Sequence, residues 1–171
     1  MPVSDGAGAI VFTDIVGFTE FTANFGDDRA LALLERQEEL VRAALPTGAR
    51  IVKQLGDGLL LFFPHMVDAL STCLALTEQY GKESTVELPL WVRTGMHFGE
   101  PRRRGDDLIG HDVNLAARVA DLAGPGEVLA TADAVAAAPT VAGVSFAELG
   151  PVFVKGIPDA VRLYRAEPLA P

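Results

Sequence analysis

Cysteine, long apolar runs and basic residues are all scarce in this sequence. Cys73 is the single cysteine among 171 residues, so disulfides within the chain and Cys-rich zinc sites are excluded. No apolar run approaches the roughly 20 residues that a membrane-spanning helix needs. The first residues, Met1 to Gly6, contain no basic region followed by an apolar one. We therefore expect no secretory signal, no membrane segment within this chain and a cytoplasmic location.

Positive charge is also in short supply. Fourteen Lys and Arg residues face 23 Asp and Glu residues, which gives a formal net charge of −9. A nucleic-acid-binding face needs a basic surface, so no nucleic-acid partner is expected. The one basic cluster, Arg102 to Arg104, is interpreted first as a solvated loop and second as a phosphate or partner contact. The Gly-x-x-x-x-Gly-Lys-[Ser/Thr] phosphate loop and the dinucleotide-binding glycine fingerprint are both absent.

Hydrophobic periodicity divides the sequence into short strands and amphipathic helices. Strands are predicted at residues 8–12, 50–55, 59–63, 90–97, 128–131, 144–153 and 160–166. Helices are predicted at 17–26, from 27 to before Pro46, from about 67 to 81, from 112 to before Gly124, and at 132–138, with a polar link over 99–107. This order predicts an α+β fold: a ferredoxin-like βαββαβ core with a mostly antiparallel sheet covered by helices, plus a C-terminal α/β extension. The length predicts one domain over residues 1–171, with its core at about 8–167.

Two acidic residues lie at predicted turns next to buried strands. Asp14 follows the strand-like run from Gly8 to Phe12, and Asp57 lies within the hairpin turn Gly56-Asp57-Gly58. A strand-end aspartate often only caps the next helix, which is the alternative for Asp14. If the first strand pairs with the hairpin, the two carboxylates could instead hold a pair of Mg²⁺ ions for phosphoryl transfer.

Three motifs occur in an order that resembles one protein family. They are Phe12-Thr13-Asp14-Ile15-Val16-Gly17-Phe18-Thr19, Lys53-Gln54-Leu55-Gly56-Asp57 and Asp107-Leu108-Ile109-Gly110-His111-Asp112-Val113-Asn114-Leu115-Ala116-Ala117-Arg118. Together they resemble the class III nucleotidyl cyclase catalytic domain, over nearly the whole chain. The Gly-Gly-[Asp/Glu]-Glu-Phe turn of diguanylate cyclases, another class of two-metal nucleotidyl transferase, is absent.

The resemblance implies a role for each matched residue. The implied ligands of two divalent cations, Mg²⁺ or Mn²⁺, are Asp14, Asp57 and the carbonyl of Ile15. The implied phosphate-binding groups are the backbone at Gly17 and Phe18 and the side chains of Arg93 and Lys155. The implied catalytic residues are Asn114, which would orient the ribose, and Arg118, which would stabilise the transition state. Lys53 and Asp107 match the pair that selects the base.

The Lys53 and Asp107 pair agrees with the hydrogen-bonding pattern of adenine. Adenine offers an acceptor at N1 and a donor at its 6-amino group, which a lysine and an aspartate complement. Guanine reverses the pattern, and guanylyl members of the family carry an acidic residue in place of the lysine. The pair therefore predicts ATP as the substrate. Asp106 is a rival to Asp107, which is preferred because its distance to Asn114 fits the family without a further gap.

The implied function is an adenylyl cyclase that converts ATP to 3′,5′-cyclic AMP and pyrophosphate in a homodimer with two composite active sites. The alternatives are a non-catalytic nucleotide-binding regulatory module of the same fold and a guanylyl cyclase. The general base stays open between an Asp carboxylate and a water.

Taken singly, Lys53 would be solvated and Arg118 a surface ion-pair partner, while His97 and His111 are expected to be structural hydrogen-bonding residues. The segment from His97 to Asp107 is shorter than the arm that contributes to dimerisation in mammalian members.

Overall fold

The computed structural model describes residues 6–169. Residues 1–5 and 170–171 of the predicted domain lie outside the described part. The elements are, in chain order, β1 (Gly8–Ile15), α1 (Phe18–Phe25), α2 (Asp27–Ala44), β2 (Arg50–Leu55), β3 (Gly58–Phe63), α3 (Met66–Glu83), β4 (Val92–Gly99), β5 (Arg102–Arg104), β6 (Asp107–Ile109), α4 (His111–Leu122), β7 (Val128–Thr131), α5 (Ala132–Ala137), β8 (Val144–Val152) and β9 (Val161–Pro168).

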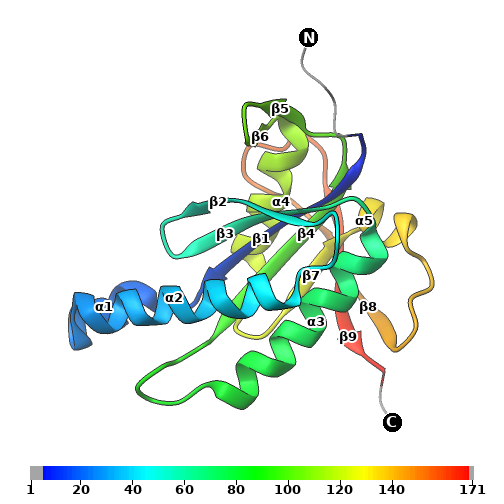
Figure 1. Cartoon of the computed structure of the whole chain (residues 1–171). Helices are drawn as coiled ribbons and strands as arrows, with labels where there is room; N and C mark the ends of the chain where they lie inside the picture. The colour runs from blue at the N-terminus through cyan, green and yellow to red at the C-terminus, as the bar shows by residue number, and fades with distance from the viewer. Residues whose placement is uncertain (1–5, 170–171) are drawn as a thin grey trace.

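A twisted sheet runs through the centre of the molecule (Figure 1). Within the described residues its strand order is β2-β3-β1-β4-β7-β9-β8. Every neighbouring pair is antiparallel except β4 and β7, which are parallel and are joined through α4. The first four strands have the order of a ferredoxin-like βαββαβ unit, and the remaining strands extend it. The predicted α+β fold with a mostly antiparallel sheet is confirmed.

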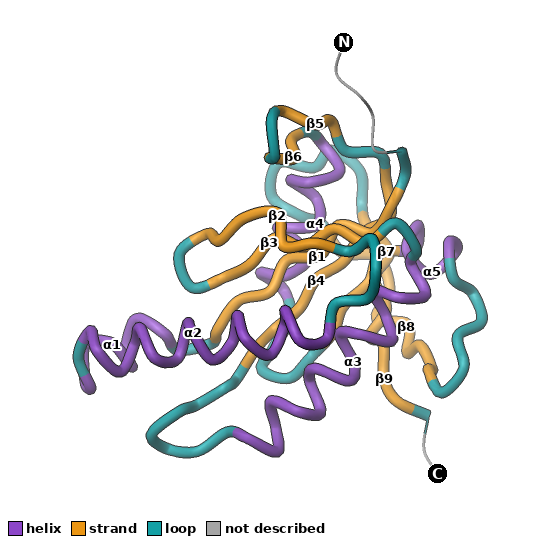
Figure 2. The backbone as a smooth tube through the Cα atoms, in the orientation of Figure 1, coloured by secondary structure: helices purple, strands orange, loops and turns teal. Residues whose placement is uncertain are grey.

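Helices cover both faces of the sheet because apolar side chains alternate along its central strands. Val11 belongs to the large core shared by α2, α3 and α5, whereas Ile10 belongs to the smaller core under α4. The tube in Figure 2 shows α2 and α3 in front of the sheet and α4 behind it. None of the described helices combines the length and apolar content that crossing a membrane requires.

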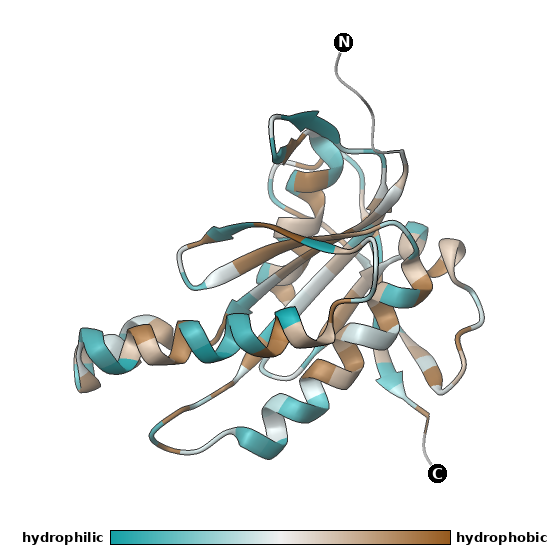
Figure 3. Cartoon of the chain, viewed as in Figure 1, coloured by the Kyte–Doolittle hydropathy of each residue, from teal (hydrophilic) through white to brown (hydrophobic). Residues whose placement is uncertain are grey.

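Three local predictions differ from the structure. Strand β1 continues through Asp14 to Ile15, and the N-cap of α1 is Gly17, so Asp14 does not cap that helix. Strand β4 begins at Val92, two residues later than predicted. The polar link contains a small hairpin, β5 and β6, in which Arg102 to Arg104 form an exposed strand rather than a loop. Figure 3 shows this strand among the most hydrophilic parts of the chain.

Strand β2 contains a β-bulge at Val52. Ile51 pairs with Leu61 and Lys53 pairs with Leu60, so Val52 and Lys53 together oppose one residue of β3. Consecutive residues of a regular strand point to opposite faces, but here both point toward α4. Val52 packs against the core under that helix, and Lys53 reaches Asp107 on β6.

Candidate active site

The structure brings Asp14 and Asp57 together at one end of the sheet. Antiparallel pairing of β1 with β3, with Thr13 opposite Leu59, places the β2–β3 turn beside the end of β1. The Asp57 carboxyl lies within hydrogen-bonding reach of the Asp14 carboxyl. Burial, and then the neighbouring Asp14 carboxyl, raise the pKa of Asp57 to about 6, while the amides of Asp57 and Ile15 act in the opposite direction. Two carboxyl groups this close repel one another when both are ionised, which favours a cation between them.

Gln37 holds the turn that carries Asp57. This residue lies on the apolar face of α2 and is completely buried, and its Nε2 donates to the carbonyl of Asp57 over 3.3 Å. Sequence periodicity places Gln37 on the core face of the helix, but it gives no partner. A glutamine within an otherwise apolar stripe was the available signal, because a buried amide needs a hydrogen-bonding group.

A chain of alternating charges leads from Asp14 to Arg118. The guanidinium of Arg93 donates to Asp14 Oδ2 from Nη2 over 2.7 Å and from Nε over 3.1 Å. Arg93 also donates from Nη1 to the carbonyl of Asp121 over 3.2 Å. The Asp121 carboxylate lies 3.7 Å from Arg118 Nη1, so this aspartate near the end of α4 joins both arginines. Asp121 lies outside the three sequence motifs and could not be predicted, since its partners are set by how α4 packs on the sheet.

A cavity of about 340 Å³ lies on the outer side of α4 and contains three of the predicted residues. Asn114 and Arg118, one helical turn apart, line it from α4, and Lys155 lines it from the loop between β8 and β9. Two cations and an amide around one open cavity suit a phosphorylated ligand. The described lining includes neither Asp14 nor Lys53, so the predicted residues do not share one cavity within this chain.

Lys53 and Asp107 form an ion pair on the same side of the sheet as α4. Lys53 Nζ lies 3.0 Å from the carboxylate, and this hydrogen bond holds the pKa of Asp107 below its usual range. Asp106 has a side chain that is 97% exposed and faces Arg103, which distinguishes it from Asp107. The two predicted base-selecting residues are thus adjacent, with both side chains still partly accessible.

The turn between β1 and α1 presents backbone groups next to the acidic pair. Gly17 adopts φ +76°, a left-handed conformation that side chains disfavour, and a Cβ there would meet nothing within 4 Å. Phe18 begins α1, whose first-turn N–H groups lack intrahelical partners. Open space beside free N–H groups at a helix N-terminus suits an anion.

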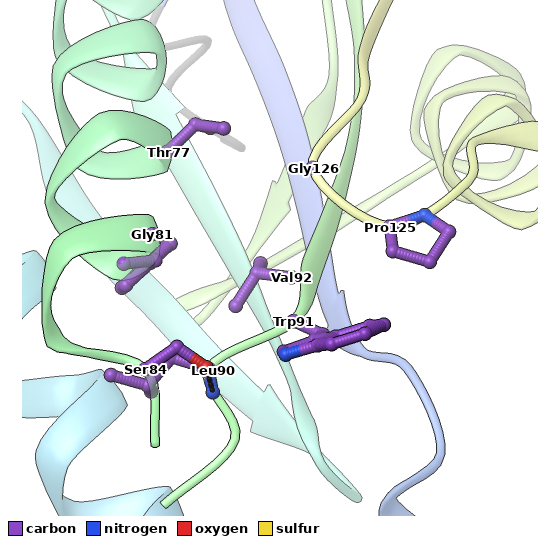
Figure 4. Close-up of a pocket in the computed structure, with 9 residues that line it drawn as sticks. Thr77, Gly81, Ser84, Leu90, Trp91, Val92, Pro125 and Gly126 are labelled. Carbon is purple, nitrogen blue, oxygen red and sulfur yellow. Dashed lines mark hydrogen bonds between the residues drawn. The ribbon is translucent and has the colours of Figure 1, made fainter. Parts of the chain in front are cut away.

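A second cavity, of about 290 Å³, lies between the end of α3 and the chain that enters β4 (Figure 4). Its lining includes Thr77 and Gly81 of α3, Ser84 directly after that helix, and the half-exposed Trp91. The described lining residues carry no Lys, Arg, Asp or Glu, so this cavity does not suit a triphosphate. It adjoins the candidate site through the backbone, since Val16 N donates to the Trp91 carbonyl over 2.7 Å.

Comparisons with known proteins identify the family of this chain. The family described as adenylate and guanylate cyclase catalytic domain matches residues 4–167. This chain belongs to that family.

Relatives and solved structures support the assignment. The pH-sensitive adenylate cyclase MT1302 of Mycobacterium tuberculosis is 30% identical over 159 residues, which is 91% of this chain and 39% of that protein. An adenylate cyclase of Streptomyces griseus is 33% identical over 119 residues, or 69% of this chain and 29% of that protein. The chain therefore spans well under half of either relative. The crystal structure of the adenylyl cyclase CyaB from P. aeruginosa superposes with a TM-score of 0.80 at 25% identity, covering 96% of this chain and 95% of that one.

Proposed function

We propose that this domain is an adenylyl cyclase that converts ATP to 3′,5′-cyclic AMP and pyrophosphate. The observation that carries the proposal is the pair of carboxyl groups, Asp14 and Asp57, at the junction of β1 and the β2–β3 turn in a chain of the cyclase family. The ribose 3′-oxygen would form the new bond to the α-phosphorus, pyrophosphate would leave, and the hydroxyl proton would pass to a water or a carboxylate. Because ATP is abundant in the cytoplasm, we place the domain there.

The residues at the acidic pair fit Mg²⁺ or Mn²⁺. Asp14, Asp57 and the carbonyl of Ile15 offer only oxygen ligands, and such cations complete their coordination with water and substrate phosphates. In the described chain no cluster of three His, Cys, Asp or Glu side chains surrounds a cation position. Two cations bound there would lower the pKa of the ribose hydroxyl and neutralise the triphosphate.

The remaining residues supply positive charge and orientation. Amides at Gly17 and Phe18 would contact the triphosphate, and Arg93 and Lys155 would pair with its β- and γ-phosphates. The Asn114 side chain would orient the ribose, while Arg118 would stabilise charge that develops on the phosphoryl oxygens. Lys53 and Asp107 would hold the adenine edge.

The positions of these residues support a homodimer with composite sites. The cavity with Asn114, Arg118 and Lys155 opens on the outer side of α4, whereas Asp14 and Asp57 lie at the sheet. A second copy related by a two-fold axis would bring the acidic group of one protomer to the cavity of its partner, twice per dimer.

The test is product identification. The purified chain is incubated with ATP or GTP and with Mg²⁺ or Mn²⁺, and the products are separated by chromatography. Cyclic AMP and pyrophosphate are expected in equal amounts, with little cyclic GMP. Cyclic GMP as the main product would identify a guanylyl cyclase, and nucleotide binding without either product would identify a regulatory module.

Base selection gives a sharper prediction. Replacing Lys53 by Glu together with Asp107 by Ala should lower kcat/KM for ATP by about 10²-fold or more, because the adenine edge then faces unmatched groups. Steady-state kinetics with ATP and GTP measure the change. Asp106→Ala is the matched control and should keep the wild-type preference, because its side chain is almost fully exposed. A double variant with undiminished preference for ATP would show that these residues do not read the base.

Arg93 should compete with metal at Asp14. Its guanidinium contacts the carboxylate that would bind the cation, and both side chains are partly exposed, at 27% and 29%. Because a pair of this kind is worth about 1 kcal/mol, Arg93→Ala should tighten Mn²⁺ binding in the absence of nucleotide by about fivefold. Titration calorimetry measures this affinity, and Arg93→Lys should change it less. Unchanged or weaker Mn²⁺ binding in Arg93→Ala would contradict the competition.

A further inference from the structure

Helix α4 lies directly on the backbone of β4 at two glycines. A Cβ at Gly95 would come within 2.1 Å of the Ala120 nitrogen, and one at Gly99 within 2.3 Å of Asp112 Oδ2. At Gly95 this close approach to the helix backbone requires glycine, whereas at Gly99 the neighbouring atoms belong to the Asp112 side chain. The helix that carries Asn114 and Arg118 is therefore seated on β4 near each of its ends.

His97 joins β4 to the first turn of α4 between these two contacts. His97 is 2% exposed, and its Nε2 lies 3.1 Å from Asp112 Oδ1. Its Nδ1 lies 2.8 Å from Thr131 Oγ1, at the junction of β7 and α5. The other carboxylate oxygen of Asp112 accepts from the Glu100 amide over 3.0 Å. Strand β4, the residue that follows it and the end of β7 are thus tied to the start of α4.

The hydrogen-bond partners of His97 assign its Nε2 as a donor. A carboxylate only accepts, so Nε2 of His97 carries a proton and donates to Asp112. Thr131 Oγ1 already accepts from the Ala134 amide over 3.2 Å, and its own hydroxyl proton can be donated to Nδ1. Each polar atom of the His97 ring is satisfied in this way, which a buried imidazole requires.

The same three side chains do not form a nucleophilic site. Hydrogen bonds link a threonine, a histidine and an aspartate in that order, which resembles a hydrolytic triad. Thr131, however, is 2% exposed, and its oxygen caps α5. No substrate can reach that hydroxyl, so the network must act through what it holds in place.

We propose that His97 is a positioning residue: through Asp112 it fixes the first turn of α4 and thereby sets Asn114 and Arg118 in the candidate site. Asp112 is two residues before Asn114, on the same helical turn. A leucine would fill a similar volume at position 97, so packing alone does not account for a polar ring with two specific partners. This inference rests on the proposed cyclase activity for its catalytic consequence. A displacement of about 1 Å at reacting groups costs about 10²-fold in rate.

Two amide variants separate the bonds of His97. In His97→Gln the side-chain amide nitrogen takes the place of Nε2 and can still donate to Asp112. In His97→Asn the amide reaches only the place of Nδ1, toward Thr131. We expect His97→Gln to keep kcat within about threefold of wild type, and His97→Asn to lose about 10-fold to 100-fold in kcat with KM for ATP nearly unchanged.

Asp112→Ala provides a second route, because it removes the partner rather than the buried ring. It should lower kcat as much as His97→Asn, and the double variant should lose no more than either single one. Equal kcat for His97→Gln and His97→Asn, or additive losses in the double variant, would overturn the proposal.

Hydrogen exchange supplies a readout that does not depend on activity. Mass spectrometry of nucleotide-free protein should show faster amide exchange from Glu100 to Arg118 in His97→Asn and Asp112→Ala, but not in His97→Gln. An inactive wild-type chain that shows this exchange pattern would refute the proposed function and leave the positioning contacts established. Slow exchange in all variants would refute the positioning itself.

Discussion

Asp57→Asn is expected to reduce cyclic AMP formation by at least about a thousandfold at saturating ATP. The substitution keeps the shape of the side chain but removes the charge that would bind metal, and metal ions supply several kcal/mol of transition-state stabilisation. Asp14→Ala should have an effect of the same size. Initial rates measured over a range of Mg²⁺ and Mn²⁺ concentrations give the comparison, and Asp28→Asn, an exposed carboxylate on α2, is the control that should retain full activity.

The same variant should not be less stable than the wild type in metal-free buffer. The raised pKa of Asp57 means that the fold disfavours its ionised form. The protonated Asp57 carboxyl contributes to the free energy of unfolding, and this contribution is fully present below a pH of about 4 and is lost as pH rises through about 6. Because the asparagine side chain stays neutral, Asp57→Asn should raise Tm most at neutral pH. Near-normal turnover in a well-folded Asp57→Asn or Asp14→Ala protein would sink the assignment of the acidic pair as the metal site.

Two inactive variants should restore one another when mixed. Asp14→Ala damages the acidic group, and Arg118→Ala damages the cavity on the outer side of α4. In a mixed dimer with composite sites, one site carries both defects and the other carries none. With random exchange, half the dimers are mixed and each has one intact site, so activity should recover to about a quarter of the wild-type level.

The matched control for this experiment combines two variants of the acidic group. A mixture of Asp14→Ala and Asp57→Ala places one defect in each site of the mixed dimer and should stay inactive. Native mass spectrometry of the mixtures verifies that subunits have exchanged. Verified mixed dimers of Asp14→Ala and Arg118→Ala that stay as inactive as either parent would show that each site is built within one chain.

Features that depend on local pattern could be predicted from the sequence. The hairpin around Asp57, the apolar face of α2 and the existence of strand β4, though not its first residue, all follow from spacing and turn residues. Arg93 and His97 are four residues apart, so alternation along β4 places them on one face, and the structure shows both facing α4. The resemblance implied that the turns carrying Asp14 and Asp57 lie close together, and the pairing of β1 with β3 supports this.

Features that depend on packing between distant segments could not be predicted. Strand β5 consists of three arginines, which show no apolar alternation, so its pairing with β6 left no pattern to detect. The partner of Gln37 lies 20 residues away, and the pairing of Asp14 with Arg93 spans 79 residues. The contact of Gln37 is set by how α2 rests on the sheet, and that of Asp14 with Arg93 by the pairing of β1 with β4, not by neighbours in the sequence.

The bulge at Val52 determines where the hairpin tolerates a change in length. The pairing register of the residues after the bulge depends on their distance from the β2–β3 turn. Lys53 therefore stays four positions before Asp57 when residues are gained or lost before it. Loss of Val52 would leave Lys53 opposite Leu60 in a regular ladder, whereas a gain or loss between Lys53 and the turn would send the lysine to the other face. Natural insertions and deletions among relatives should therefore gather before this lysine, and alignments of distant sequences should place their gaps there.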